Sequence, residues 1–83
     1  MIYKIAFKKS VARDLKRIDK NHVDTILGRI EEELPEKAES FPVLSGAFSG
    51  LRKFRIGDYR VVYTIINDTV LILRISHRRK AYR

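Results

Sequence analysis

Four side chains among the last 33 residues have the chemistry to bind phosphate groups. They are Lys53, Arg55, Arg60 and His77. Arginine and lysine bind phosphate oxygens, and a lysine amine or a histidine ring can also transfer a proton during catalysis. These residues therefore form a candidate phosphate-binding site if the fold brings them together.

The strands that must position these residues are marked by two short turns. Three β-branched and aromatic runs, at 51–56, 59–66 and 69–77, are separated by Gly57-Asp58 and Asn67-Asp68. Such two-residue turns are typical of β-hairpins and set the pairing of the flanking strands. The first turn places Arg55 opposite Arg60 and Lys53 opposite Val62. The second turn places Val62 opposite Leu73 and Arg60 opposite Ile75.

This register divides the three strands into an apolar face and a cationic face, because directly opposed residues share a face and successive residues alternate. The apolar face is expected to hold Phe54, Ile56, Tyr59, Val61, Tyr63, Ile65, Val70 and Ile72. The other face is expected to hold Lys53, Arg55, Arg60 and His77 at one end, with Val62, Thr64, Leu71 and Leu73 further along. Arg74 falls on the apolar face and does not fit there, so it lies at the edge of the sheet or the register is off by one.

The cationic cluster favours phosphate binding over simple solvation. Directly opposed Arg55 and Arg60 repel each other, which a fold would normally avoid unless an anion binds between them. The alternative is that these are ordinary polar residues on the open side of an antiparallel sheet. Any one of them alone is explained well by that alternative, whereas the whole cluster is not.

The distribution of charge supports the same interpretation. The formal net charge is +8, and residues 51–83 hold 9 Lys and Arg against 2 acidic residues, whereas residues 1–50 hold 9 against 8. Segregation of this kind is typical of proteins that bind a polyanion or an acidic partner. A basic surface that only aids solubility is the alternative, although solubility does not require the signs to be separated.

Other features of the composition exclude several classes of protein. With no cysteine there is no disulfide framework and no cysteine-based zinc site, and His22 and His77 are too few to predict a metal site, so we expect neither metal nor cofactor. The longest aliphatic run, residues 70–73, is far shorter than the roughly 20 residues of a membrane span. The sequence predicts a cytoplasmic protein without membrane contact.

The N-terminal half predicts the helical part of the fold. Residues 2–7 are typical of a strand, Ser10 is a candidate helix N-cap, and Asn21 is a second one, with Asp24 following in the first turn. Apolar residues at helical spacing then form one stripe: Val23, Ile26, Leu27, Ile30 and Leu34. Pro35 is expected to end or kink this second helix. Residues 1–83 are therefore predicted to form a single α+β domain: an N-terminal strand, a two-helix hairpin joined near Lys20, and an antiparallel β-meander packed against the helices.

Three segments of the chain resemble a known family. The residues Leu44-Ser45-Gly46 and Arg55-Ile56-Gly57-Asp58-Tyr59-Arg60-Val61-Val62-Tyr63 are similar to the Leu-x-Gly … Arg-x-Gly-x-Tyr-Arg-x-x-Tyr signature of RelE/ParE toxins. The closing His77-Arg78-Arg79-Lys80-Ala81-Tyr82 resembles the terminal His-Arg-x-x-x-Tyr element of that family. The resemblance spans the whole chain and implies a RelE-like fold.

For function, the resemblance implies a toxin of a type II toxin–antitoxin system that cleaves mRNA in the ribosome by attack of a 2′-hydroxyl on the adjacent phosphate. By position, Lys53 resembles the lysine that transfers a proton, Arg60 and Arg78 resemble arginines that hold the phosphate, and Tyr82 resembles a tyrosine that contacts the substrate base. Substrate-binding roles would fall to the neighbouring cations Arg52, Arg55, Arg79 and Lys80. The implied partners are a cognate acidic antitoxin, the ribosome and mRNA.

One departure from the family pattern leaves the proton transfer open. Leu51 stands where some members carry a second lysine, so Lys53 or His77 is expected to take the main role. Tyr82 is explained equally well as a cover over the edge of the core.

Two other functions remain open: a ParE-like toxin that acts on DNA gyrase without cutting RNA, and a non-toxic RNA-binding module. The joint presence of Lys53, Arg60, His77 and Tyr82 argues against the first, and the chain has no RNP-type or glycine-rich RNA signature to support the second.

Overall fold

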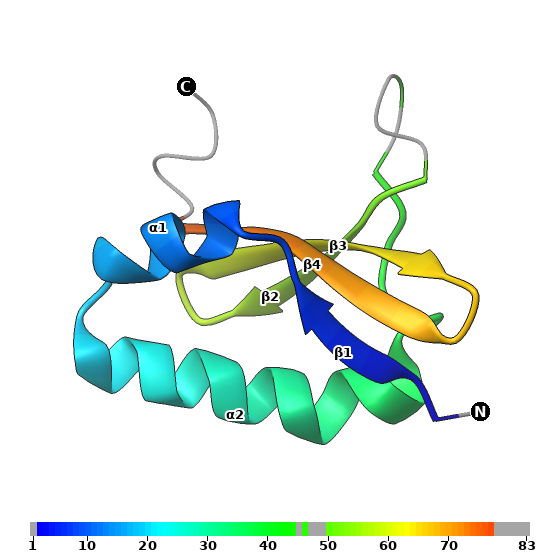
Figure 1. Ribbon diagram of the computed structural model, residues 1–83, viewed down its shortest axis with the longest axis horizontal. Helices are drawn as coiled ribbons and strands as arrows, with labels where there is room; N and C mark the ends of the chain where they lie inside the picture. Colours follow the sequence, from blue (N-terminus) through cyan, green and yellow to red (C-terminus); the bar gives the residue numbers. More distant parts are fainter. Residues whose placement is uncertain (1, 45, 47–49, 78–83) are drawn as a thin grey trace.

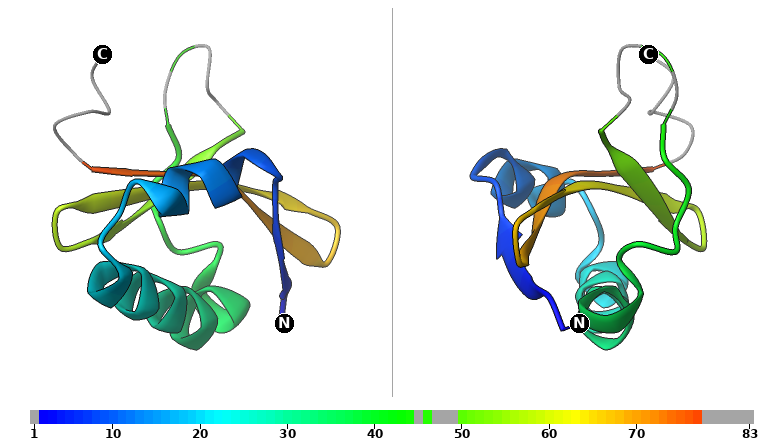
Figure 2. Two further views of the ribbon diagram at one scale, coloured as in Figure 1. Left: turned by 60° about the vertical axis from the view of Figure 1, so that its left-hand side comes forward. Right: turned by 90° about the vertical axis from the view of Figure 1, so that its right-hand side faces the viewer.

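The computed structural model describes residues 2–44, 46 and 50–77. Its elements follow in the order β1 (Lys4–Phe7), α1 (Ser10–Lys16), α2 (Lys20–Lys37), β2 (Arg52–Ile56), β3 (Tyr59–Ile66) and β4 (Thr69–His77). They form one twisted four-stranded sheet with α2 beneath one face and α1 alongside β4 (Figures 1 and 2). The predicted α+β class and the predicted order of elements are confirmed.

The strand order across the sheet is β1-β4-β3-β2. The three C-terminal strands form the predicted antiparallel meander, and both predicted turns are present. Gly57 and Asn67 adopt positive φ in these turns, at 57° and 55°, a conformation that glycine and asparagine tolerate best. The first strand pairs in parallel with β4, with Lys4 opposite Thr69 and Phe7 opposite Ile72. Chain segments from the two ends of the sequence therefore lie side by side.

The helices begin and end slightly away from the predicted positions. Lys9 is the N-cap of α1 and Asp19 that of α2, and neither makes a side-chain cap, so the predictions for Ser10 and Asn21 were wrong. The backbone carbonyl of Asp19 instead accepts the N–H groups of His22 and Val23, at 2.9 and 3.0 Å. A helix can start without a capping side chain when packing of its apolar face supplies the stability.

Pro35 does not end α2, which continues to Lys37. The carbonyl oxygen of Pro35 accepts the N–H of Tyr3 at 2.8 Å, so the residue before β1 is tied to the end of the helix.

The core lies between α2 and the predicted apolar face of the sheet. Its buried side chains are Tyr3, Val11, Ile26, Ile30, Leu34, Ala38, Phe54, Ile56, Val61, Tyr63, Val70, Ile72 and Ile75. All eight residues predicted for the apolar face are in this core or packed against it. Ile26, Ile30 and Leu34 from the predicted helical stripe are fully buried. The face of the sheet opposite α2 is therefore not part of this core.

Tyr63 is the largest fully buried side chain, and its hydroxyl donates a hydrogen bond of 2.6 Å to the carbonyl oxygen of Ala38. Replacement by phenylalanine leaves that buried carbonyl without its donor, so we expect the Tyr63→Phe variant to lose about 1–3 kcal/mol of stability at neutral pH. Urea unfolding of the two proteins at pH 7 measures this difference.

The same variant tests an alkaline effect. Burial raises the pKa of Tyr63 from 10.0 to about 12. Because the folded-state pKa lies above the unfolded one, the stabilisation is complete below the unfolded value of 10.0 and is lost as the pH rises toward 12. The free energy of unfolding should therefore fall more steeply with pH in this window for the wild type than for Tyr63→Phe. Parallel curves would contradict the assignment.

Candidate functional site

Three cations from two strands share the face of the sheet opposite α2, which we call the open face. Arg55 lies opposite Arg60, and Lys53 lies opposite Val62, as predicted. Lys53 and Arg60 are half-buried and Arg55 is exposed. The register therefore brings Lys53 and Arg60 to one side of the sheet, as a shared phosphate site requires.

The pairing across the second turn differs from the prediction because β4 contains a β-bulge. Ile66 lies opposite Thr69 as expected, but the register shifts between Val62 and Tyr63, so that Leu73 is passed over. Arg60 lies opposite Ser76 instead of Ile75, and Val62 opposite Arg74 instead of Leu73. A shift of one residue exchanges the two faces of a strand.

The bulge resolves the misfit of Arg74. It turns Ile75 into the core, where it is 1% exposed, and moves Arg74 out to the open face. The physical reason is that burial of an isoleucine stabilises the fold, whereas burial of an unpaired guanidinium is very costly.

The same bulge places His77 away from the cations, so the prediction that it shares their face was wrong. His77 pairs with Tyr59, whose side chain packs against the core. Its ring makes an edge contact with the ring of Tyr59 at a centroid distance of 5.3 Å, and the centroid of the His22 ring lies 5.5 Å from that of Tyr59. His77 is therefore part of an aromatic group at the end of the sheet.

Arg52 also lies away from the open face. It pairs with Tyr63 on the core side, and its guanidinium donates to the carbonyl oxygens of Glu39 and Phe41 at 3.1 and 2.7 Å. Its observed contacts hold the segment that follows α2, and its role in binding substrate stays a prediction. Alternation along β2 separates Arg52 from Lys53.

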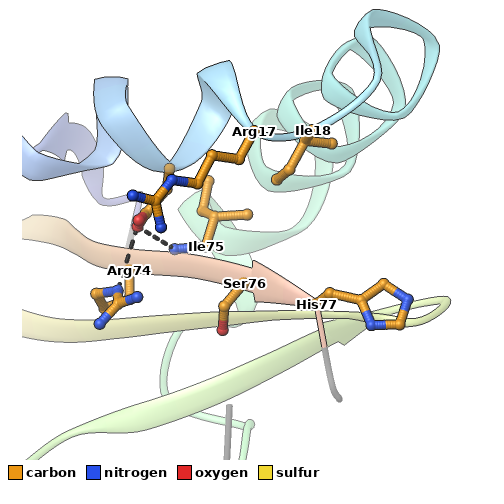
Figure 3. A pocket seen from close by; sticks show the side chains of 7 residues that line it. Arg17, Ile18, Arg74, Ile75, Ser76 and His77 are labelled. Carbon is orange, nitrogen blue, oxygen red and sulfur yellow. Dashed lines mark hydrogen bonds and ion pairs between the residues drawn. The ribbon is translucent and has the colours of Figure 1, made fainter. Parts of the chain in front are cut away.

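A pocket that the sequence did not indicate lies between α1 and the end of β4 (Figure 3). It has a volume of about 370 Å³ and is lined by Asp14, Arg17, Ile18, Arg74, Ile75, Ser76 and His77. Oδ2 of Asp14 accepts the backbone N–H of Ile75 at 3.0 Å and lies 3.3 Å from Nε of Arg74. Arg74, which the predicted register put on the apolar face, was the one sequence signal that pointed to this region.

At this edge of β4, the Asp14 carboxylate accepts a backbone hydrogen bond that a neighbouring strand would otherwise accept. The pairing of β1 with β4 stops at Ile72, and the carboxylate satisfies the Ile75 N–H beyond that point. We expect Asp14→Ala to cost about 1–3 kcal/mol because this N–H loses its acceptor. Asp14→Asn keeps an acceptor oxygen and should cost less. Urea unfolding of both variants tests the pair, and equal losses would contradict this role.

The remaining candidates, Arg78, Arg79, Lys80 and Tyr82, lie outside the described residues. Within residues 2–44, 46 and 50–77, no three His, Cys, Asp or Glu side chains gather in a way that could hold a metal ion. No helix in this part of the chain is long and apolar enough to cross a membrane.

Comparison with known proteins identifies the family. Residues 5–82 match the family model of the ParE toxin of type II toxin–antitoxin systems. No curated protein matches the chain by sequence.

Solved structures show the same fold. The toxin–antitoxin complex RelBE2 from Mycobacterium tuberculosis contains a chain with 26% identity and a TM-score of 0.87, and the match covers 94% of this chain and 100% of that one. The archaeal RelE–RelB complex from Pyrococcus horikoshii matches with 28% identity and a TM-score of 0.72, covering 94% and 97%. A mutant of the Escherichia coli toxin RelE with an antitoxin RelB peptide matches in fold, with 17% identity, a TM-score of 0.74 and coverage of 99% and 92%. The chain belongs to the ParE toxin family of type II toxin–antitoxin systems, within the RelE/ParE superfamily.

Proposed function

We propose that this toxin is an endoribonuclease of the RelE type, which cleaves mRNA in the ribosome. The observation that carries the proposal is the common placement of Lys53, Arg55 and Arg60 on the open face. Three cations on one surface bind the backbone of a nucleic acid, and a lysine among them supplies a group able to transfer a proton.

The proposed reaction needs no cofactor. The 2′-oxygen attacks the adjacent phosphorus and loses its proton, the bond from phosphorus to the 5′-oxygen breaks, and that oxygen gains a proton. The products are a 2′,3′-cyclic phosphate and a 5′-hydroxyl. Arg60 stabilises the charge that builds on the phosphate, and Arg55 holds the neighbouring backbone. Lys53 takes the main role in proton transfer in this proposal, because the bulge separates His77 from the cations.

Arg78 and Tyr82 complete the proposed site on the strength of the family pattern, with Arg78 on the phosphate and Tyr82 against a base. Arg79 and Lys80 would extend the contact with the RNA backbone.

We further propose that an acidic antitoxin silences the toxin in the cytoplasm. Relatives of this chain have been solved in complex with RelB antitoxins. Along α1 and the start of α2 the surface has apolar hollows, with Ala12 and Leu15 common to two of them. Exposed lysines border these hollows: Lys8, Lys9, Lys16 and Lys20. An amphipathic helix with acidic flanks is complementary to such a surface.

Mapping of mRNA ends after a brief induction tests the nuclease. Primer extension on translated messages should reveal new 5′ ends within codons, which disappear when translation is blocked beforehand. Growth arrest with intact messages would count decisively against the proposal.

The second candidate is a toxin that acts on DNA gyrase, and the match to the ParE family model favours it. Inhibition of supercoiling by purified gyrase, together with induction of a DNA-damage response, would establish this activity. If the toxin acts on gyrase and not on RNA, the 5′ ends of translated messages remain unchanged.

A further inference from the structure

We propose that the pocket between α1 and the end of β4 is a second phosphate subsite, which holds an RNA phosphodiester next to the one that is cleaved. This inference rests on the proposed nuclease function and places the neighbouring RNA phosphate where the open face meets α1. The residues that would bind the phosphate are Arg17, the C-cap residue of α1, and Arg74 of β4, neither of which belongs to the family signature.

The pocket has the size and the lining for a charged ligand. Its volume of about 370 Å³ lies within the range of small-molecule sites. Arg17 reaches from α1 toward β4, and Arg74 lies beside the strand, so that two guanidinium groups border the same space (Figure 3). Ser76 adds a hydroxyl that can donate to a phosphate oxygen.

The acidic residue in the pocket does not cancel this attraction. Asp14 is 12% exposed, and its Oδ2 is engaged by the Ile75 N–H and by Nε of Arg74. Arg74 itself is 62% exposed. A guanidinium has five N–H donors in a planar fork, so a contact through Nε leaves Arg74 able to bind a further anion. Asp14 thus orients Arg74 and leaves its outer edge toward the solvent.

The pocket is continuous with the open face. Ser76 lies opposite Arg60, and Arg74 lies opposite Val62, which in turn lies opposite Lys53. Two strand spacings separate the backbones at Lys53 and Arg74, a distance of about 10 Å. A single-stranded RNA that crosses the strands from β2 toward α1 therefore passes from the proposed cleavage site directly to the pocket.

Titration with a 2′-O-methylated RNA oligonucleotide, followed by the amide resonances of the isotope-labelled toxin, tests the subsite. This RNA lacks the attacking 2′-hydroxyl, so the wild-type chain is usable. We expect amides of Arg17, Ile75 and Ser76 to shift together with those of Lys53 and Arg60. Shifts confined to Lys53, Arg55 and Arg60 would overturn the subsite and leave the nuclease proposal intact. Shifts at the pocket would support a phosphate site there even if primer extension finds cellular mRNA intact. In that case the nuclease activity would be excluded.

Salt dependence gives a second, quantitative test on the same RNA. Each phosphate contact on a single strand contributes about −0.7 to the slope of log K against log salt concentration. Arg17→Gln and Arg74→Gln should each reduce the magnitude of the slope by up to about 0.7, the contribution of the one phosphate that both arginines contact, whereas Arg74→Lys should preserve it. The matched control is Arg13→Gln, an exposed arginine of α1 that does not line the pocket. A change of slope as large in the control as in the two pocket variants, or no binding by the wild type, would overturn the proposal.

Discussion

The Lys53→Ala toxin is expected to cleave ribosome-bound mRNA at least about 100-fold more slowly than the wild type, because general acid–base catalysis contributes about 10²–10⁴-fold. Arg60→Ala should show a loss of about 10²–10³-fold, the usual effect of removing a group that stabilises transition-state charge. Single-turnover cleavage of a programmed ribosome measures both losses. Growth of cells that express each variant gives the corresponding measure of toxicity.

These losses should occur in folded proteins. Lys53 and Arg60 lie on the open face and make no part of the core. Substitutions at such positions change stability by roughly 0.5 kcal/mol. Arg60→Ala also removes the repulsion between two opposed arginines, which offsets part of any loss. Unfolding midpoints close to that of the wild type would therefore accompany the loss of activity.

A charge-matched control separates catalysis from the general attraction of a basic protein for RNA. Lys37→Ala removes an exposed lysine at the end of α2, which lies beneath the other face of the sheet. Its cleavage rate should stay near that of the wild type. Retained killing by a Lys53→Ala, Arg60→Ala double variant would refute the assigned site, whatever the fold.

The Phe54→Ala variant is expected to lose toxicity for a different reason, through the fold. Phe54 is 2% exposed, and its ring packs against Phe41 at a centroid distance of 4.5 Å, with the guanidinium of Arg29 at 5.8 Å. Removal of a buried phenylalanine costs about 3–5 kcal/mol. Domains of this size are stable by about 5–15 kcal/mol in total, so this loss removes a large part of the stability.

Phe54 connects the core to the site, since it lies on β2 between Lys53 and Arg55. Its burial directs both neighbours to the open face. Urea unfolding of Phe54→Ala, with Phe54→Leu as a milder comparison, should rank the two variants in the same order as their residual toxicity. A Phe54→Ala protein as stable as the wild type would show that this contact does not hold β2 in place.

Local sequence patterns determined much of the fold. The turns at Gly57-Asp58 and Asn67-Asp68 and the apolar alternation of the flanking runs predicted the meander, because both signals act within a few residues. The first hairpin was correct residue by residue, and it placed Lys53, Arg55 and Arg60 on one face. Three of the five residues of the predicted helical stripe, Ile26, Ile30 and Leu34, are buried.

Tertiary structure decided the features that depend on distant contacts. The parallel pairing of β1 with β4 joins segments more than sixty residues apart, and no local pattern specifies it. Because of the bulge at Leu73, Arg74 and His77 each lie on the face of the sheet opposite to the predicted one. The physical reason is that burial of Ile75 against the helices outweighed regular pairing with β3. Asp14 meets Ile75 and Arg74 only because α1 takes up the edge of β4 where β1 stops. A strand's own residues determine its alternation, but the register along its whole length depends on which side chains the rest of the molecule can bury.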